Sequence, residues 1–325
     1  MRNQIASPAR EGDGLTRILV TGAAGFIGRA LCRGLVERGH AVLGCTRGPV
    51  EPIPGIEIIP IGDIGPRTNW SRCFDHIDVA IHLANRAHRP AAIADLADEA
   101  AAAAALARGA AASGARRLVH MSSVRAMGAA TPPGAPFRAA DPPFPVDAYG
   151  RAKLATEHAL AAAAQETGLE LVILRPPLVY GPAVKANFRA LIRLAGSGLP
   201  LPFAGLDNRR SLIFVENLVD AAAHAAIQPD AAGRVLLIRD AIDFSTPELI
   251  RRLAAGLGRR ARLFAAPEGA LALLRRLPAL GPFAARLTLS LQVDDSATRQ
   301  VLGWAPPVTP EAGLAATVRA FRNRR

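Results

Sequence analysis

Three glycines spaced three residues apart constrain this chain more than any other feature of its sequence. They lie between an apolar, strand-like run and a segment whose apolar side chains recur at helical spacing. In a strand–turn–helix unit, the first glycine allows a sharp turn and the second lets the backbone approach a pyrophosphate. The third lets helix and strand pack closely, and the free N–H groups at the helix start attract the anion. The residues of this turn predicted to contact a dinucleotide are Gly22, Gly25, Phe26, Ile27 and Gly28.

Strand-like and helix-like segments alternate on both sides of this turn. Strands are predicted at 17–20, 41–45, 57–60, 79–83, 118–121, 171–174 and near 235–238, and helices at 26–38, 91–112 and 148–167. Such alternation implies right-handed crossovers and a parallel sheet covered on both faces. We therefore predict an α/β fold, a Rossmann doubly wound parallel sheet with a smaller C-terminal substrate-binding lobe.

The rhythm of the sequence changes after Gly181, where proline and glycine divide the chain into shorter pieces. This change predicts how the chain is divided. We expect a flexible N-terminal tail over 1–15 and a dinucleotide-binding domain over 16–183, with a returning piece near 211–240. The substrate-binding lobe is then formed by 184–210 and 241–325.

The end of the second predicted strand indicates which dinucleotide binds. An acidic residue there would accept hydrogen bonds from the adenosine ribose and repel a 2′-phosphate. This chain instead has Thr46 and Arg47, with no carboxylate before Glu51. Because a guanidinium suits a phosphate, NADP(H) is favoured over NAD(H), which stays the alternative. Further contacts at the strand ends are expected from Asp63, Ile64, Leu83 and Ala84.

Tyrosine and lysine are both rare, and one of each forms a pair. Tyr149 and Lys153 lie four residues apart in a predicted helix, which places them on one face one turn apart. A phenol has a pKa of about 10, and a nearby ammonium favours the phenolate. The pair can then exchange the proton of an alcohol while hydride leaves or joins its carbon. Ser123, at the end of the fifth strand, is predicted to hydrogen-bond the same oxygen.

The overall composition excludes several classes of protein. The net charge is +12, but only Lys153 and Lys185 are lysines among 39 basic residues, so the excess reflects a general use of arginine. No basic run carries interleaved aromatic residues, and we expect no nucleic-acid partner. The segment 91–112 is too charged to span a bilayer. Three cysteines without metal-ligand spacing predict no metal site and are typical of a reducing compartment, so we expect a cytoplasmic protein.

With these motifs in this order, the chain resembles the extended short-chain dehydrogenase/reductases of the NAD-dependent epimerase/dehydratase family. The resemblance runs from Arg17 to the Leu302-Gly303-Trp304 element. It implies that Ser123, Tyr149 and Lys153 form the catalytic set, that Tyr149 and Lys153 also contact the cofactor, and that the substrate is a nucleotide sugar. It also implies a homodimer formed through the helices at 91–112 and 148–167.

Several stretches are similar to one branch, the bacterial nucleotide-sugar 4-epimerases and 4-keto-sugar reductases of surface-polysaccharide synthesis. They are Arg175–Pro182, Val184–Phe188, Gly198–Phe203 and Asn208–Ser211. This similarity implies that Asn187 and Arg210 hold the nucleotide diphosphate, with Arg286 as a weaker candidate. Lys185 lies in the same region, as a substrate contact or a solvent-facing charge. Tyr180 is expected to pack at the rim of the pocket.

The chain also departs from the family's pattern. It has Met127-Gly128 where many members have Tyr-Gly, and no Glu at Ala139-Ala140-Asp141. The usual Asn and Thr of the helix at 91–112 are expected at Ala101 and Ala103, so a polar group near the site would be lost.

Three functions remain after this reading. The leading one is an NADPH-dependent reductase of a UDP-linked 4-keto-6-deoxy-hexosamine, because a reductase consumes the NADPH that Arg47 favours. The alternative is a 4-epimerase of UDP-glucose or UDP-N-acetylglucosamine with tightly bound NAD, which shares every catalytic residue. A non-catalytic dinucleotide-binding regulator is a remote third.

Overall fold

The computed structural model describes residues 16–70, 73–84, 93–277 and 281–324. The predicted flexible tail, 1–15, lies outside these residues. Within them, the strands are β1 (Arg17–Thr21), β2 (Ala41–Thr46), β3 (Glu57–Pro60), β4 (Val79–His82), β5 (Arg117–Met121), β6 (Glu170–Arg175), β7 (Leu178–Tyr180), β8 (Pro200–Leu201), β9 (Leu212–Phe214), β10 (Val235–Leu237) and β11 (Arg262–Leu263).

The helices follow the strands in alternation over the first half of the chain. They are α1 (Phe26–Glu37), α2 (Ile93–Ala112), α3 (Ala148–Thr167), α4 (Ala186–Ala195), α5 (Val215–Ile227), α6 (Thr246–Gly256), α7 (Glu268–Arg276), α8 (Gly281–Thr288), α9 (Ser296–Leu302) and α10 (Pro310–Arg322), with short 3₁₀ turns at Val124–Ala126 and Pro229–Ala231.

Seven of these strands form one parallel sheet in the order β10-β6-β5-β4-β1-β2-β3. The order runs outward in both directions from β1, as in a doubly wound sheet. All seven strands coincide with those predicted from the sequence, to within one or two residues at their ends. The predicted α/β fold with a doubly wound parallel sheet is therefore confirmed.

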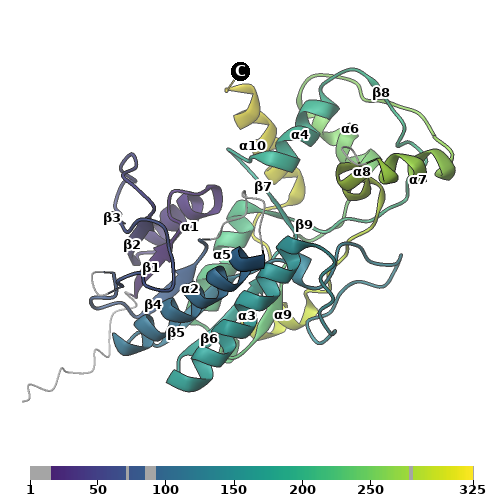
Figure 1. The fold of residues 1–325 in the computed structure, drawn as a ribbon. Helices are drawn as coiled ribbons and strands as arrows, with labels where there is room; N and C mark the ends of the chain where they lie inside the picture. Colours follow the sequence, from purple (N-terminus) through teal and green to yellow (C-terminus); the bar gives the residue numbers. More distant parts are fainter. Residues whose placement is uncertain (1–15, 71–72, 85–92, 278–280, 325) are drawn as a thin grey trace, which may run out of the picture.

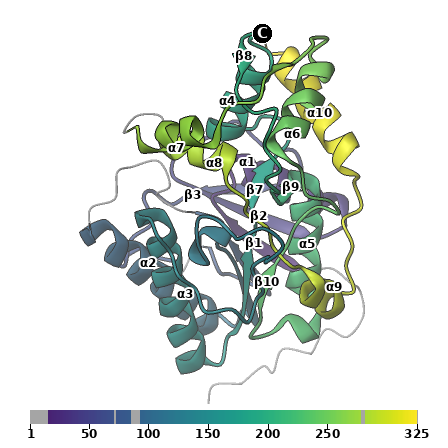
Figure 2. The ribbon, with the colours of Figure 1, turned by 90° about the vertical axis from the view of Figure 1, so that its right-hand side faces the viewer.

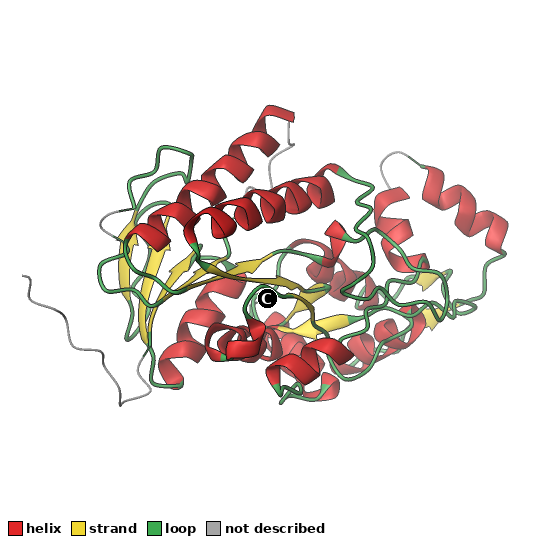
Figure 3. Cartoon of the chain, turned by 90° about the horizontal axis from the view of Figure 1, so that it is seen from below, coloured by secondary structure: helices red, strands yellow, loops and turns green. Residues whose placement is uncertain are grey.

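Helices cover both faces of this sheet (Figure 3). On one face, the apolar side chains of β1 and the sheet centre pack against α1 and the alanine-rich α5. On the other face, the alternate side chains of the same strands pack against α2 and α3, which lie side by side. Because both faces are buried, the strands are mostly apolar and do not alternate regularly between apolar and polar residues.

A second apolar core lies outside the sheet. It is formed by α4, α6, α7, α8 and α10, together with Tyr180 and Phe214. Figures 1 and 2 show these helices gathered at one end of the molecule, beyond the sheet. The division of the chain into the predicted ranges stays a proposal. One part of the range 241–325 packs elsewhere, since Leu302 and Trp304 are buried in the core of the sheet.

Asp240 connects the sheet to this second core. Its fully buried carboxylate accepts hydrogen bonds from the Tyr180 hydroxyl, at 2.7 Å, and from the Phe214 backbone N–H, at 3.0 Å. The side chain of Asn217, in α5, donates to the same carboxylate and exchanges two further hydrogen bonds with the backbone of Val308. Tyr180 is therefore an interior residue, and the expectation that it packs at the pocket rim is wrong.

No helix within the described residues is both long enough and apolar enough to cross a membrane.

Candidate active site

A cleft of about 990 Å³ runs along the carboxyl ends of the sheet strands and under the second core. Its walls come from the β1–α1 turn, from the ends of β2, β3, β4 and β5, and from the first residues of α3 and α4. Arg210 and Arg286 close the opposite side. In a doubly wound sheet the ligand binds at this edge, because the strand order reverses there and opens a crevice.

The geometry of the glycine turn fits a dinucleotide. Gly22 has a φ of +75°, and a side chain there would come within 3.1 Å of the backbone nitrogen of Ala84. A Cβ on Gly28 would lie 2.1 Å from the carbonyl oxygen of Gly22, so only glycine lets α1 begin this close to β1. The first N–H groups of α1 have no acceptor within the helix and line the cleft at Phe26 and Ile27.

At the adenosine end of the cleft, two predicted cofactor contacts are paired with each other. Arg47 Nε lies 2.6 Å from Asp63 Oδ1, and both side chains are more than half exposed. Thr46 donates its hydroxyl to the carbonyl of Gly48 at 2.8 Å. A carboxylate therefore stands beside Arg47 after all, but it comes from the end of β3 instead of β2. Ile64, Leu83 and Ala84 line the cleft as expected.

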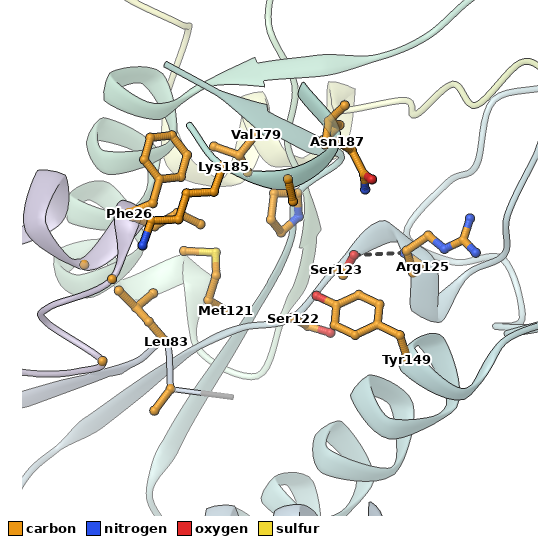
Figure 4. A pocket seen from close by; sticks show the side chains of 18 of the residues that line it. Phe26, Leu83, Met121, Ser122, Ser123, Arg125, Tyr149, Val179, Lys185 and Asn187 are labelled. Carbon is orange, nitrogen blue, oxygen red and sulfur yellow. Dashed lines mark hydrogen bonds between the residues drawn. The ribbon is translucent and has the colours of Figure 1, made fainter. Parts of the chain in front are cut away.

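Ser123 and Tyr149 meet in the middle of the cleft (Figure 4). Ser123 follows β5, and its Oγ accepts a hydrogen bond from the backbone N–H of Arg125 at 3.2 Å. Tyr149 lies in the first turn of α3, where Asp147 caps the helix by accepting from the Gly150 N–H at 2.7 Å. The Tyr149 hydroxyl lies next to Ser123 (Figure 4).

The electrostatics at Tyr149 differ from the prediction. Burial of the phenol raises its pKa above the usual value, and the hydrogen bond from Ser123 is the main effect that lowers it. The charges of Glu99 and Asp147 raise the pKa further, whereas Arg125 lowers it. Ser123 and Arg125, and not Lys153, are therefore the principal groups that favour the phenolate in this structure.

Lys153 lies one turn behind Tyr149 and is 2% exposed. Of the predicted site residues, all within the described part of the chain, Lys153 alone does not line the cleft. Its Nζ donates to the carbonyl of Met121 at 3.4 Å. Burial lowers the pKa of Lys153, and the charges of Glu99 and Glu157 oppose that shift.

A layer of buried polar side chains lies near Lys153, below the Ser123–Tyr149 pair. His82 Nδ1 is 2.7 Å from the hydroxyl of Thr21, and the rings of His82 and His120 stack at 5.4 Å. Burial lowers the pKa of His82 to about 3, with a further contribution from the Lys153 charge, and the pKa of His120 falls for the same reasons. Both rings are therefore neutral, and they put no competing positive charge beside the ammonium.

An internal ion pair supports the end of β5. Glu157, one turn beyond Lys153 on α3, binds the guanidinium of Arg175 at 3.0 Å through Nε and again through Nη2. The hydroxyl of Ser122 donates to the same carboxylate. Arg175 and Glu157 are 5% and 3% exposed, so this network fixes the residue next to Ser123 from inside the protein.

The three predicted substrate residues meet on the wall facing the Ser123–Tyr149 pair. Arg286 donates to the side-chain oxygen of Asn187 at 2.9 Å, and Arg210 donates to the carbonyl of Leu289 at 2.9 Å. Burial and then repulsion from Arg125 and Arg286 lower the pKa of Arg210 to about 10, so it stays protonated at neutral pH. Lys185 also lines the cleft and extends toward Phe26, at the dinucleotide end (Figure 4).

The sequence analysis did not predict three charged residues that line the cleft. Arg125, Asp147 and Glu99 all line it. Glu99 is on the same face of α2 as Ala103, so the expectation that this helix has lost its polar group near the site is corrected. Ala101 is exposed and is not part of the cleft. The spacing of Glu99 and Ala103, four residues apart on a helix, was the signal that could have shown it.

Comparison with known proteins shows which family the chain belongs to. The sequence profile described as "NAD dependent epimerase/dehydratase family" matches residues 18–238. The chain belongs to this family. It is thus an enzyme of a family that acts with a nicotinamide dinucleotide, and the predicted resemblance is confirmed.

Curated members of the epimerase/dehydratase family match most of the chain. A UDP-glucose 4-epimerase of Vibrio cholerae is 37% identical over 312 residues, covering 94% of this chain and 95% of the relative. A UDP-glucose 4-epimerase of Mycolicibacterium smegmatis is 29% identical over 329 residues, covering 95% and 99%.

Solved structures of family members share the fold. MoeE5, solved with UDP-glucose and NAD, has a TM-score of 0.76 at 27% identity and covers 95% of this chain and 99% of its own. The same protein was also solved with UDP-glucuronic acid and NAD, at 26% identity over the same share of this chain. A UDP-N-acetylglucosamine 4-epimerase of Bacillus cereus has a TM-score of 0.77 at 18% identity, covers 94% and 99%, and shows the fold alone.

Proposed function

We propose that this family member is an NAD-dependent 4-epimerase of a UDP-linked hexose. The observation that carries the proposal is that one cleft joins the glycine turn, the Ser123–Tyr149 pair and a wall bearing Arg210 and Arg286. The named function of the 37% identical relative supports it. The sequence analysis gave this function as its alternative, and it is now better supported than the NADPH-dependent reductase that the sequence analysis favoured.

Each group of the cleft has a role in this proposal. The dinucleotide, held by the turn at Gly22–Gly28 and by the ends of β2 and β3, supplies the hydride acceptor and donor for C4. Tyr149 takes the proton of the C4 hydroxyl and gives it back, and Ser123 hydrogen-bonds the same oxygen. Ser123 and Arg125 favour the negative charge that forms on Tyr149, and Lys153, one turn behind on the same helix, is assigned a secondary positive charge there.

The substrate diphosphate is assigned to the opposite wall. Arg210 and Arg286 present guanidinium groups whose hydrogen-bond partners are a backbone carbonyl and the amide of Asn187, not carboxylates. Guanidinium groups match phosphate oxygens in geometry and charge. Asn187, in the first turn of α4, is positioned to assist them.

The ion pair at the adenosine end favours NAD over NADP. A 2′-phosphate would have to break the contact between Arg47 and Asp63 and accept a carboxylate as a neighbour. The sequence-based preference for NADP(H) rested on Arg47 alone. Solved relatives hold NAD, which agrees with this proposal.

Asp63→Asn is expected to shift the cofactor preference toward NADP. The change frees Arg47 for a 2′-phosphate and removes a negative charge, so the affinity ratio of NADPH to NADH should rise severalfold, on the order of 1 kcal/mol for an exposed pair. Calorimetric titration with each dinucleotide measures it. Asp75→Asn, at an exposed carboxylate that contacts His76 outside the cleft, is the matched control and should leave the ratio unchanged. An unchanged ratio in Asp63→Asn would contradict the assignment of the pair.

The activity is tested by identifying the dinucleotide that purifies with the protein and by assaying UDP-glucose. An epimerase regenerates its cofactor in every turnover. We therefore expect bound NAD that survives dialysis, and conversion of UDP-glucose to UDP-galactose without added cofactor. An empty protein that prefers NADPH and reduces a UDP-linked 4-keto-6-deoxy-hexosamine would instead support the second candidate, which the missing carboxylate at the end of β2 favours.

A further inference from the structure

An ion pair lies in the cleft wall next to the reacting groups. The guanidinium of Arg125 contacts the carboxylate of Asp147, and both residues line the cleft. Arg125 comes two residues after Ser123, and Asp147 two residues before Tyr149. Figure 4 shows Arg125 on the side of Ser123 and Tyr149 that faces away from the dinucleotide turn. The pair therefore belongs to the half of the cleft assigned to the substrate.

The position of this pair is fixed by the start of α3. Asp147 Oδ1 accepts the hydrogen bond from Gly150 N–H that caps the helix, which leaves Oδ2 for Arg125. Burial would raise the pKa of Asp147, but the bonds from Gly150 and Arg125 outweigh it and lower the pKa below its usual value. Asp147 is thus a permanent, oriented negative charge in the substrate half.

The charges on this side of the cleft are unevenly matched. Arg125 is neutralised by Asp147, whereas the hydrogen bonds of Arg210 and Arg286 go to uncharged acceptors. Among the lining residues that the structure describes on the substrate side, two guanidinium groups are therefore left for the two negative charges of a diphosphate.

The inference assigns the C6 group of the hexose to this pair. Ser123 and Tyr149 mark the oxygen on C4, whose ring neighbours are C3 and C5, and we take the C5 side, which bears C6, to be the one that faces Arg125 and Asp147. A neutral hydroxymethyl group at C6 can accept a hydrogen bond from Arg125 without disturbing Asp147. A carboxylate at C6 would face the Asp147 carboxylate at close range, and like charges that meet in a partly buried site repel each other.

We propose that the Arg125–Asp147 pair selects a neutral hexose and rejects a hexuronate. The inference rests on the proposed function, and it narrows the substrate class of the same site. Arg125 is the attractive element, a donor to the C6 oxygen, and Asp147 is the repulsive one. One solved relative, MoeE5, holds UDP-glucose in one structure and UDP-glucuronic acid in another, so these two sugar nucleotides are the ones to compare.

The test compares UDP-glucose with UDP-glucuronate on the NAD-loaded protein, by Kd from calorimetry and by kcat/KM. Asp147→Asn keeps a side-chain acceptor for the helix cap and removes only the charge. We expect the unmodified protein to prefer UDP-glucose, and Asp147→Asn to move both ratios toward UDP-glucuronate by about tenfold. Adding Arg125→Met to Asp147→Asn should remove that gain, because the freed guanidinium is what binds the carboxylate.

Glu166→Gln is the matched control. It removes one carboxylate from the same helix at an exposed ion pair with Arg108, outside the cleft, and should leave the ratios unchanged. Ratios that do not move in Asp147→Asn, or an unmodified protein that prefers UDP-glucuronate, would overturn the inference. If the Kd ratio behaves as expected but neither sugar is epimerised, the proposed function fails and the inference stands. Binding of neither sugar nucleotide overturns both.

Discussion

Tyr149→Phe is expected to lower the turnover of a UDP-hexose by a factor of about 10²–10⁴ while the dinucleotide stays bound. The hydroxyl of Tyr149 is the group that faces Ser123 in the cleft, and no other phenol lines it among the described residues. Because the ring remains, the cleft keeps its shape, so the loss should appear in kcat more than in KM. The measurement is steady-state kinetics with UDP-glucose, together with the absorbance of the bound dinucleotide.

The pH dependence of the rate gives this prediction a second readout. The pKa of Tyr149 is raised, so the phenolate fraction, and with it the rate of proton removal, should increase with pH through the neutral range. In Tyr149→Phe that increase should disappear. Tyr180→Phe is the control, since it makes the same change at a buried tyrosine bonded to Asp240. It should lower Tm and keep the pH profile. Full activity in Tyr149→Phe would refute the catalytic assignment.

Arg175→Met is expected to destabilise the protein by about 3–5 kcal/mol. The substitution preserves the length of the side chain but leaves the buried Glu157 carboxylate with the hydroxyl of Ser122 as its remaining hydrogen-bond partner among the described residues. A buried charge without its partner carries the full desolvation penalty. The free energy of unfolding, measured by urea denaturation monitored by circular dichroism, should fall by this amount.

The double variant Arg175→Met/Glu157→Leu separates the cost of an unpaired charge from the loss of packing. Replacing both partners by apolar groups removes the charge that was left behind, and such replacements are often close to neutral. We therefore expect the double variant to be more stable than Arg175→Met alone. A double variant that is less stable would show that the ion pair itself, and not the penalty of breaking it, holds this part of the fold.

Much of the architecture was predictable because each sheet strand is short, apolar and bounded by turn residues. The glycine turn was predictable because its geometry requires glycine: the carbonyl oxygen of Gly22 leaves no room for a side chain at Gly28. A turn of this kind is therefore visible in the sequence as spaced glycines. The positions of Ser123 and Tyr149 followed from the ends of β5 and the start of α3. Local sequence patterns carry this kind of information well.

What the sequence did not reveal depends on contacts between distant segments. The pairing of Arg47 with Asp63 joins the ends of two strands and reverses the inference drawn from Arg47 alone. The burial of Lys153 and the interior place of Tyr180 depend on how α3 and α10 close over the sheet. Arg125 and Asp147, 22 residues apart, meet only because the end of β5 lies beside the start of α3. The homodimer through α2 and α3 stays a prediction.

The hydrogen bonds of Asn217 affect how the protein can be made in the cell. This buried amide sits between Asp240 and Val308, and nearby Trp304 donates to Asp220 on the same helix at 2.8 Å. The helix that backs the central strands is therefore finished by residues that the ribosome adds long after the dinucleotide turn. A nascent chain that ends before residue 304 has all seven strands of the sheet, and Asn217 and Asp220 keep Asp240 and Arg38 as partners but lack Val308 and Trp304. We therefore expect this helix to reach its full stability only after residue 308 has been synthesised.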